Sequence, residues 1–332
     1  MTTTQIVLAA RPIGLPGIEN FRFEKKELPL IQAGETLLKG LYYSVDPYLR
    51  GRMNDAMSYV PSFQLGEPIE GSIVARVSES QSTKFKVGDL VIGRLPWQQE
   101  IIASENNLQK IESTDAPLSY YLGVLGMTGL TAYLGLENIC KPKSGETLVV
   151  SGAAGAVGLI VGQIAKLQSC KVIGITGSDE KVKLLKDKYG FDEAINYKTT
   201  RDLKKFISLI CPDGVDIYFD NVGGIISDAV ISNLNFHARV AICGQISLYN
   251  STKSPLGPRV QPTLLTKSAL MQGFIIGNFQ SQFAEATDQL STWVRHGKLQ
   301  FNETIIQGFD NLPSAFLGLF SGENIGKMIV QA

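Results

Sequence analysis

The chain has 332 residues, of which 44% are hydrophobic and 19% are charged, and its 31 Lys and Arg balance 31 Asp and Glu. This composition excludes a disordered chain, and the zero net charge argues against a nucleic acid or an anionic membrane as the main partner. The length is sufficient for two domains, each with its own hydrophobic core.

Cysteine and histidine are sparse and scattered along the chain. No two cysteines form a CxxC pair, and the positions of the two residue types are Cys140, Cys170, Cys211, Cys243, His237 and His296. A zinc ion needs Cys, His or carboxylate ligands that converge, so we expect no metal site. Scattered cysteines are typical of a reducing compartment, and the first residues lack the basic and apolar segments of a secretory signal. We therefore expect a cytoplasmic protein.

Residues 1–125 are expected to form a β-rich domain. Short apolar runs at Glu35–Val45, Gly71–Val77 and Leu90–Arg94 alternate with turns that contain Gly or Pro. Closely spaced strands with such turns are typical of a small barrel or sandwich.

From residue 126 the pattern changes to strands that alternate with helices. The expected strands are Glu146–Val150, Lys171–Ile175, Glu193–Tyr197, Val215–Asp220 and Arg239–Cys243, and the expected helices are Ala156–Leu167, Asp179–Tyr189, Thr200–Ile210 and Ile225–Leu234. Repeated βα units predict a doubly wound parallel sheet, and hence an α/β fold class. Two uncharged stretches, 116–136 and 147–165, have the length of a membrane span, but glycines interrupt both, so we expect no membrane helix.

The C-terminal third begins with a loop rich in Pro and Gly that extends to Thr263. A strand at Gly273–Gly277 and a helix at Gln282–His296 are expected to follow. The tail has strand-like runs at Thr304–Gln307 and Met328–Val330 around one short helix, and we expect it to return to the first domain. The expected organisation is therefore a first domain at 1–125, a second at 126–298, and a return segment at 299–332.

A glycine-rich segment, Ala153–Gly158, follows the first strand of the second domain with the pattern A-x-G-x-x-G. Glycines in such a loop provide a tight turn, room for a pyrophosphate and close packing of helix on strand. The next helix offers free N–H groups at its N-terminus. The strand before and the helix after favour a dinucleotide-binding loop; the alternative is a tight turn in an α/β core that binds no ligand.

The end of the following strand favours NADP(H) over NAD(H). An NAD site usually places Asp or Glu there to bind the ribose 2′-hydroxyl. Here Gly177 and Ser178 follow the strand, and Lys181 lies in the first turn of the next helix. A hydroxyl and an ammonium group suit a 2′-phosphate. Asp179 keeps the alternative open, because NAD(H) is favoured if its carboxylate faces the ribose.

A series of short, distinct motifs extends along nearly the whole chain. They are Val45–Arg50, Gly126–Tyr133, Ala153–Gly158, Gly177–Lys181, Asn196–Lys198, Asp220–Gly224, Ile242–Ser247 with Tyr249 and Asn250, and Glu323–Lys327. Together they resemble the medium-chain dehydrogenase/reductase family, and within it the zinc-free prostaglandin reductase and leukotriene hydroxydehydrogenase group with its bacterial curcumin-reductase-like members. Gly66–Gly71 lacks the histidine that the zinc branch carries in G-H-E-x-x-G, and Thr128 stands where relatives often have proline. The resemblance implies a GroES-like β-barrel domain and a Rossmann domain.

The resemblance also implies a set of NADP(H)-binding residues. These are Gly155, Ala156, Val157 and Gly158 at the pyrophosphate; Ser178, Lys181 and Tyr197 at the 2′-phosphate; Asn221, Cys243, Gly244, Ile246, Ser247 and Tyr249 along the path to the nicotinamide; Phe274, Ile275, Ile276 and Asn324 at the nicotinamide end; and Met127 and Thr131 as further contacts. Cys243 is expected to act through its backbone rather than as a nucleophile, because no histidine motif accompanies it.

Without zinc, a conjugated carbonyl is an easier substrate than a simple ketone, because hydride addition at the β-carbon leaves a delocalised enolate. We expect an NADPH-dependent reductase of the C=C bond of α,β-unsaturated ketones or aldehydes. Tyr48 and Tyr249 are the candidate catalytic residues, as hydrogen-bond donors to the developing oxyanion. Quinone reduction and NADPH binding without turnover are the alternatives. Relatives suggest a homodimer, and we expect no nucleic-acid or membrane partner.

Overall fold

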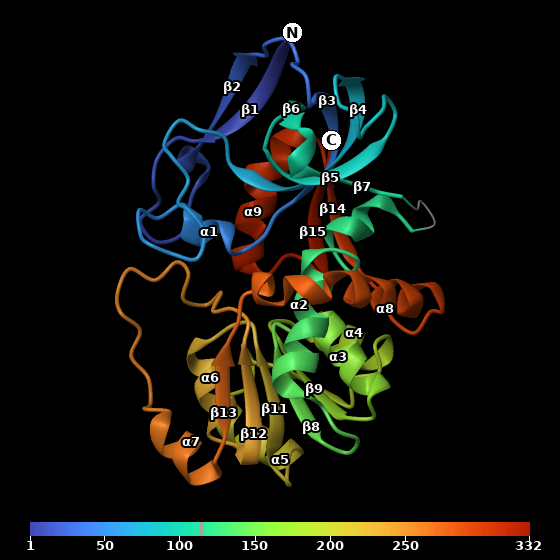
Figure 1. The fold of residues 1–332 in the computed structure, drawn as a ribbon. Helices are drawn as coiled ribbons and strands as arrows, with labels where there is room; N and C mark the ends of the chain where they lie inside the picture. The colour runs from blue at the N-terminus through green and yellow to red at the C-terminus, as the bar shows by residue number, and fades with distance from the viewer. Residues whose placement is uncertain (113–115) are drawn as a thin grey trace. The chain divides into compact units, whose positions relative to one another are not determined.

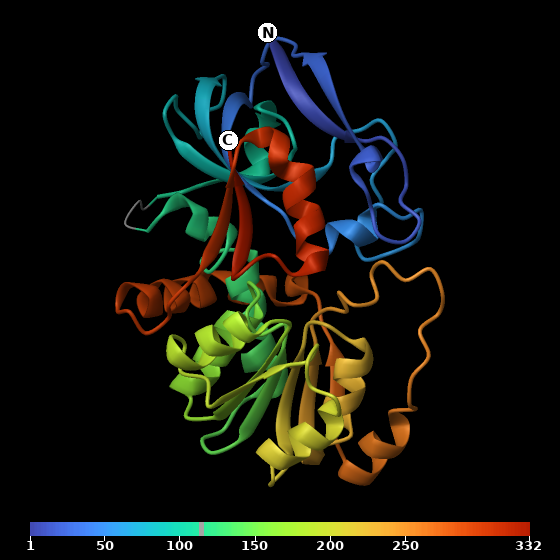
Figure 2. The ribbon, with the colours of Figure 1, turned by 180° about the vertical axis from the view of Figure 1, so that it is seen from behind.

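The computed structural model describes residues 1–112 and 116–332, which form two compact units. Unit 1 comprises Met1–Leu122, Thr304–Asn324 and Met328–Ala332. Unit 2 comprises Gly123–Glu303 and Ile325–Lys327. Most of the strands and α-helices of both are labelled in Figure 1, and Figure 2 shows them from behind.

Unit 1 is built mainly of antiparallel strands. Its elements are β1 (Thr2–Leu8), β2 (Phe21–Glu27), β3 (Glu35–Ser44), α1 (Leu49–Arg52), β4 (Glu70–Ser80), β5 (Leu90–Pro96), β6 (Glu100–Ser104), β7 (Leu108–Lys110), β14 (Glu303–Gln307), α9 (Leu312–Ser321), β15 (Lys327–Gln331) and the short 3₁₀ helices Ile18–Asn20, Glu105–Asn107, Leu118–Leu122 and Phe309–Asn311. The main sheet has the order β14-β15-β3-β4-β5-β7, and β6 pairs with β3. β1 and β2 form a separate antiparallel pair.

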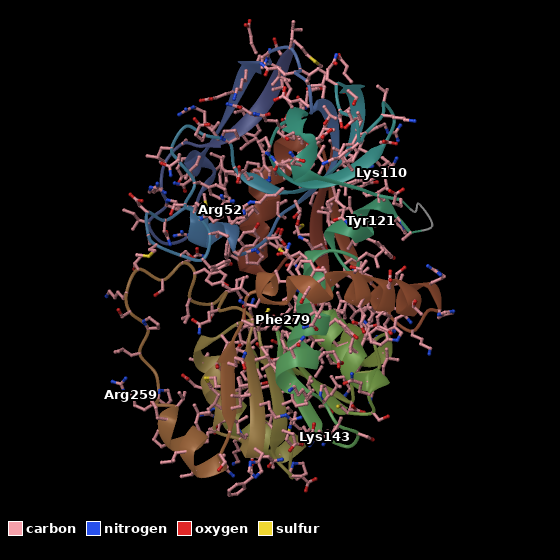
Figure 3. The ribbon with its side chains drawn as sticks, in the orientation of Figure 1. Arg52, Lys110, Tyr121, Lys143, Arg259 and Phe279 are labelled. Carbon is pink, nitrogen blue, oxygen red and sulfur yellow. The ribbon has the colours of Figure 1, made fainter. Side chains whose placement is uncertain are left out.

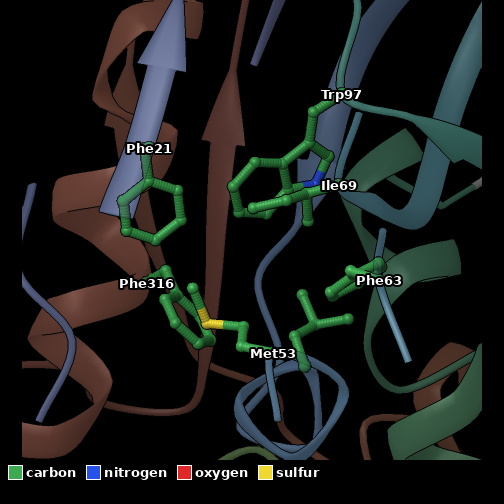
Figure 4. A pocket seen from close by; sticks show the side chains of 7 residues that line it. Phe21, Met53, Phe63, Ile69, Trp97 and Phe316 are labelled. Carbon is green, nitrogen blue, oxygen red and sulfur yellow. The ribbon is translucent and has the colours of Figure 1, made fainter. Parts of the chain in front are cut away.

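The core of unit 1 is aromatic at its centre. Phe21 stacks on Trp97 with ring centroids 6.5 Å apart, and meets Phe316 of α9 edge-on at 6.1 Å. Figure 4 shows these rings with Met53, Phe63 and other apolar side chains around a small gap that has no room for a water molecule. Burying such side chains is the main stabilisation of a domain of this size.

Unit 2 is a parallel sheet covered by helices. Its elements are α2 (Met127–Gly135), which continues as a π-helical turn (Leu136–Cys140), β8 (Thr147–Ser151), α3 (Gly158–Leu167), β9 (Lys171–Thr176), α4 (Asp179–Asp187), β10 (Glu193–Asn196), α5 (Leu203–Ile210), β11 (Val215–Asp220), α6 (Gly224–Ile231), β12 (Leu234–Ile242), α7 (Gln261–Lys267), β13 (Leu270–Gly273), the 3₁₀ helix Ile276–Gln282 and α8 (Phe283–Arg295). The strand order is β10-β9-β8-β11-β12-β13, with parallel pairing throughout. Helices lie on both faces of the sheet (Figures 1 and 2).

The predicted parallel sheet and α/β fold class are confirmed. The strand Val215–Asp220 is found with the bounds expected, whereas the strand expected at Gly273–Gly277 is wrong in place. The observed strand β13 ends at Gly273. Ile275 donates its N–H to Oδ1 of Asn278 at 2.9 Å, and the chain turns into a helix from Ile276. Among the described residues no helix combines the length and apolarity that a membrane span requires.

Candidate functional site

The glycine-rich turn of unit 2 connects β8 to α3 at the point where the strand order reverses. From β8 the chain proceeds to β9 and β10 on one side, and β11 to β13 lie on the other. Open parallel sheets bind their ligands at such a switch point, beyond the carboxyl ends of the strands. The predicted pyrophosphate residues, Gly155 to Gly158, occupy this position in unit 2.

Steric contacts explain why the turn requires glycine. Gly152 has a φ of +60°, a backbone angle that residues other than glycine rarely adopt. A Cβ placed on Gly158 would lie 2.9 Å from Cα of Ala153 and even closer to the carbonyl oxygen of Gly152, so the start of α3 approaches the backbone of the turn too closely for a side chain. The N–H of Gly155 donates to the carbonyl of Gly152 at 2.9 Å and closes the turn.

The N-terminus of α3 has the character of an anion site. Val157 precedes the helix and provides no side-chain cap, and no acidic residue lies in the first turn. The first N–H groups of a helix have no partners within it and carry a partial positive charge. A pyrophosphate fits this donor set and the glycine backbone beside it.

Gly326 also lies at this turn, from the far end of the chain. Its N–H donates to the carbonyl of Ala154 at 2.7 Å, and it forms a parallel bridge with Gly155. Asn324, which the sequence predicts at the nicotinamide, belongs to unit 1. The motif Glu323–Lys327 indicated this segment, although it did not single out Gly326.

The predicted 2′-phosphate residues gather beyond the ends of β9 and β10. Ser178 caps α4, because its Oγ accepts the N–H of Lys181 at 3.3 Å. A Cβ on Gly177 would lie 3.3 Å from the ring of Tyr197 and 3.4 Å from Cε of Lys198, so both side chains lie against this turn. The structure therefore brings Ser178, Lys181 and Tyr197 together, and adds Lys198.

The electrostatics of this cluster favour a bound anion. Lys181 is half-buried. Its pKa is lowered mainly by burial and also by the nearby positive charge of Lys198. Two ammonium groups that repel each other are stabilised when a multiply charged anion binds both. Glu180 is also near, and a hydrogen bond from Ser178 lowers the pKa of its carboxyl. The sequence reasoning missed Lys198 as a site residue, although the motif Asn196–Lys198 contains it.

Asp179, which left NAD(H) open as an alternative, is engaged within the protein. Its Oδ1 accepts a hydrogen bond of 2.7 Å from Nδ2 of Asn196, the last residue of β10. The carboxylate is therefore held by a side-chain amide of the neighbouring strand.

The end of β11 is tied to the end of β8. Asn221 donates its N–H to Oγ of Ser151 at 3.0 Å and its Nδ2 to the carbonyl of Ser151 at 2.8 Å. Asp220 is fully buried, and its Oδ1 accepts from Ser151, Tyr218, Val222 and Gly223 at 2.8–3.0 Å. These bonds fix the backbone at the switch point.

The predicted loop at 243–249 is hydrogen-bonded to the same segment at the end of β11. Cys243 and Gly244 donate their N–H groups to the carbonyl of Asp220 at 2.8 and 3.1 Å. Ile246 bonds to the carbonyl of Asn221, and Ser247 bonds to that of Val222 through both its N–H and its hydroxyl. Burial raises the pKa of Cys243 to about 12, so this group is a neutral thiol at neutral pH.

Tyr249 and Tyr48, the two candidate catalytic residues, belong to different units. Tyr249 is in unit 2, and its hydroxyl accepts the N–H of Gln245 at 3.3 Å. Tyr48 is in unit 1 at the start of α1, and burial, with the charge of Asp46, raises its pKa to about 12. Burial also raises the pKa of Tyr249. Both hydroxyls therefore keep their protons at neutral pH.

The remaining predicted contacts are spread over unit 2. Met127 and Thr131 lie on α2, where the hydroxyl of Thr131 donates to the carbonyl of Met127 at 2.7 Å. The ring of Phe274 packs against Phe219 and Phe279, and Ile275 is 39% exposed. Phe279 is labelled in Figure 3.

Arg50, two residues after Tyr48 in the sequence, serves the framework of unit 1. Its guanidinium donates to Oδ1 of Asn54 at 2.6 Å and to the carbonyl of Gly14 at 2.8 Å. Arg52 (Figure 3) lies over the ring of Phe63. Within the described ranges, no three His, Cys, Asp or Glu side chains are grouped to hold a metal ion.

Comparison with known proteins gives matches along nearly the whole chain. Residues 4–111 match the family profile described as "N-terminal domain of oxidoreductase", and residues 156–292 match "Zinc-binding dehydrogenase". The chain is 46% identical to prostaglandin reductase 1 of Bos taurus, over 96% of each chain. It is 43% identical to the NADP(+)-dependent 2-alkenal reductase of Nicotiana tabacum, over 99% of this chain and 97% of the relative. The crystal structure of CurA from Vibrio vulnificus in complex with NADPH superposes with a TM-score of 0.95 at 44% identity, over 99% of each chain.

Proposed function

Because this chain belongs to the zinc-free prostaglandin reductase group of the medium-chain dehydrogenase/reductase family, we propose that it reduces the C=C bond of α,β-unsaturated ketones and aldehydes with NADPH. The observation that supports NADPH as the cofactor is the cluster of Ser178, Lys181 and Tyr197 beside the ends of β9 and β10. The carboxylate of Asp179, which an NAD site would use, is held by Asn196.

The residues of unit 2 fit the shape and charge of NADPH. The start of α3 has no side chain at Gly158 and no capping side chain, which leaves backbone N–H groups for the pyrophosphate. Lys181 and Lys198 provide positive charge for the 2′-phosphate. Bound NADPH supplies a hydride to the β-carbon of the substrate.

The protein's own contribution to the chemistry is a hydrogen-bond donor for the oxygen that gains charge. Tyr48 and Tyr249 are the candidates that we propose. The hydroxyl of Tyr249 accepts a bond from the N–H of Gln245 and keeps its proton for donation. The raised pKa of each tyrosine keeps that proton in place at neutral pH.

We propose a second copy of this chain as the protein partner, bound at the edge of the unit 2 sheet. β13 is the edge strand, and α7 beside it has no buried residue. Leu265 and Leu270 are 80% and 47% exposed there. An unpaired edge is self-complementary for antiparallel pairing across a two-fold axis. The exposed loop before α7, with Arg259 labelled in Figure 3, borders this edge.

Light scattering tests the dimer, with the variant Leu270→Lys expected to be monomeric. A monomeric wild-type chain contradicts it. The compartment that we propose is the cytoplasm, and the four free cysteines support this.

Consumption of NADPH in the presence of a simple enone tests the activity. Turnover that yields the saturated ketone supports the proposal. Tight NADPH binding without turnover of any enone contradicts it, and faster turnover of a quinone under the same conditions favours quinone reduction.

A further inference from the structure

Asn196 connects the start of α4 to the turn after β10 in the 2′-phosphate cluster, although it was not a candidate site residue. It ends β10 and is 9% exposed. Its Nδ2 donates to Asp179 at 2.7 Å, and its Oδ1 accepts the N–H of Lys198 at 3.1 Å. These two partners fix the orientation of the amide, because a carboxylate only accepts and an N–H only donates.

The backbone of Asn196 holds the turn that follows. Its carbonyl accepts the N–H and the hydroxyl of Thr200, at 3.1 and 2.8 Å, and the N–H of Thr199 at 3.3 Å. Tyr197 donates its N–H to the carbonyl of Thr176, at the end of β9, at 3.0 Å. The side chains of Tyr197 and Lys198 are thereby directed to the turn at Gly177.

Asp179 is the group that would oppose a 2′-phosphate. A carboxylate beyond the end of the second strand favours the ribose hydroxyl of NAD(H) and repels a phosphate. Here it occupies the first position of α4, where the helix dipole already stabilises it, and the Asn196 amide takes up its Oδ1. The cluster therefore contains an acid that its neighbour on β10 holds by a hydrogen bond.

We propose that Asn196 is a positioning residue that sets the preference for NADPH, by holding the Asp179 carboxylate and by fixing the turn that carries Lys198 to the 2′-phosphate. This inference rests on the proposed function, because it concerns how the same cofactor is selected. Lys198 then acts with Lys181 as a second cation for the phosphate.

Binding, rather than activity, provides the test. Dissociation constants of NADPH, NADH and adenosine 2′,5′-bisphosphate are measured by calorimetry on the full chain. Asn196→Asp replaces the donor with a second carboxylate that faces Asp179. It is expected to weaken the binding of NADPH and of the bisphosphate by about tenfold or more, a change of the size of one charge-assisted hydrogen bond. The binding of NADH is expected to weaken by no more than about twofold.

The double variant Asp179→Asn with Asn196→Asp exchanges the amide and the carboxylate and keeps the net charge. It restores a donor–acceptor pair, so NADPH binding is expected to return to within about threefold of wild type. Thermal melting of each variant shows whether it is folded. Equal losses for NADPH and NADH in Asn196→Asp, or no recovery in the folded double variant, overturn the inference.

Lys198→Gln provides an independent check, with Lys183→Gln as its control because Lys183 is an exposed lysine of α4. Lys198→Gln is expected to weaken NADPH selectively and to reduce the dependence of its binding on ionic strength. An effect equal to that of Lys183→Gln contradicts a role for Lys198.

The wild-type chain separates this inference from the proposed function. Preferred binding of NADPH that survives Asn196→Asp overturns the inference alone. Equal wild-type affinity for NADPH and NADH overturns both the proposed cofactor and the inference.

Discussion

The hydroxyl of Ser151, at the end of β8, donates a hydrogen bond of 3.0 Å to Oδ1 of Asp220, at the end of β11. The two strands are neighbours in the sheet and flank the switch point. The same carboxylate oxygen accepts three further donors, so one buried side chain organises the turn after β11. The loop at 243–249 depends on it in turn, because Cys243 and Gly244 bond to the carbonyl of Asp220.

Asp220→Asn is expected to destabilise unit 2. The substitution keeps the shape but replaces four charge-assisted bonds with weaker ones, and each buried donor that loses its partner costs about 1–3 kcal/mol. We expect a clear fall in the urea midpoint, together with similar losses of NADPH and NADH binding. Asp213→Asn, an exposed position just before β11, is the control and should leave the midpoint unchanged. Normal stability of Asp220→Asn would contradict this role.

Lys181→Ala is expected to separate the two cofactors. Lys181 lies in the cluster that we assign to the 2′-phosphate, and a phosphate that loses one cation should bind about tenfold or more weakly. NADH has no such phosphate and should be little affected. Calorimetry with both cofactors measures the ratio, with Lys183→Ala as control. Equal losses would mean that Lys181 does not contact the 2′-phosphate.

Glu146 is expected to make the stability of unit 2 depend on pH. Arg239 donates to both of its carboxylate oxygens, at 2.8 and 2.6 Å. Burial acts to raise the pKa of Glu146, but the bonds and charge of Arg239 and the N–H of Lys143 outweigh it, so the pKa is lowered. A lowered folded-state pKa means that the stabilisation is present above the unfolded value of about 4.3 and disappears as the pH falls through the folded value.

Glu146→Gln should therefore be less stable than wild type at neutral pH by about 1–3 kcal/mol, and the two should converge in acid. Urea unfolding over a series of pH values measures this. Glu193→Gln is the control, since the Lys186–Glu193 pair is more exposed and should contribute about 0–1 kcal/mol. A difference that does not change with pH would exclude the ion pair as its cause.

Tyr48→Phe and Tyr249→Phe are expected to reveal the donor to the oxyanion. Loss of a positioned donor should lower kcat by about 10²–10³-fold with little change in NADPH binding. If a tyrosine only orders the cofactor loop, its substitution should instead weaken NADPH binding and leave kcat nearly unchanged. Steady-state kinetics and calorimetry distinguish the two results for each variant.

Much of unit 2 could be predicted from the sequence because its strands are buried, short and followed by clear helix signals. Val215–Asp220 is an example, since five of its six residues are fully buried or nearly so. β2 in unit 1 could not, because its sequence FRFEKKE is mostly charged and only Phe21 is buried. Its place in the structure comes from pairing with β1. α2 was missed because the glycines Gly129 and Gly135 interrupt its helical pattern.

The candidate site divides in the same way. Ser178 and Lys181 are close in sequence, so their common position was predictable from the helix that they begin. Lys198 and Asn196 reach the same cluster only through the parallel pairing of β10 with β9, which no local pattern reveals. Asp220 was noted as part of a motif, but its bond with Ser151 depends on the register of β11 against β8.

The most direct measurement is the fate of the hydride. NADPH deuterated at the transferred position of the nicotinamide is incubated with the protein and an α,β-unsaturated ketone, and the product is examined by NMR and mass spectrometry. Our account predicts a saturated ketone with one deuterium at the β-carbon. An allylic alcohol with deuterium at the carbonyl carbon, or no consumption of NADPH by any enone, would contradict it.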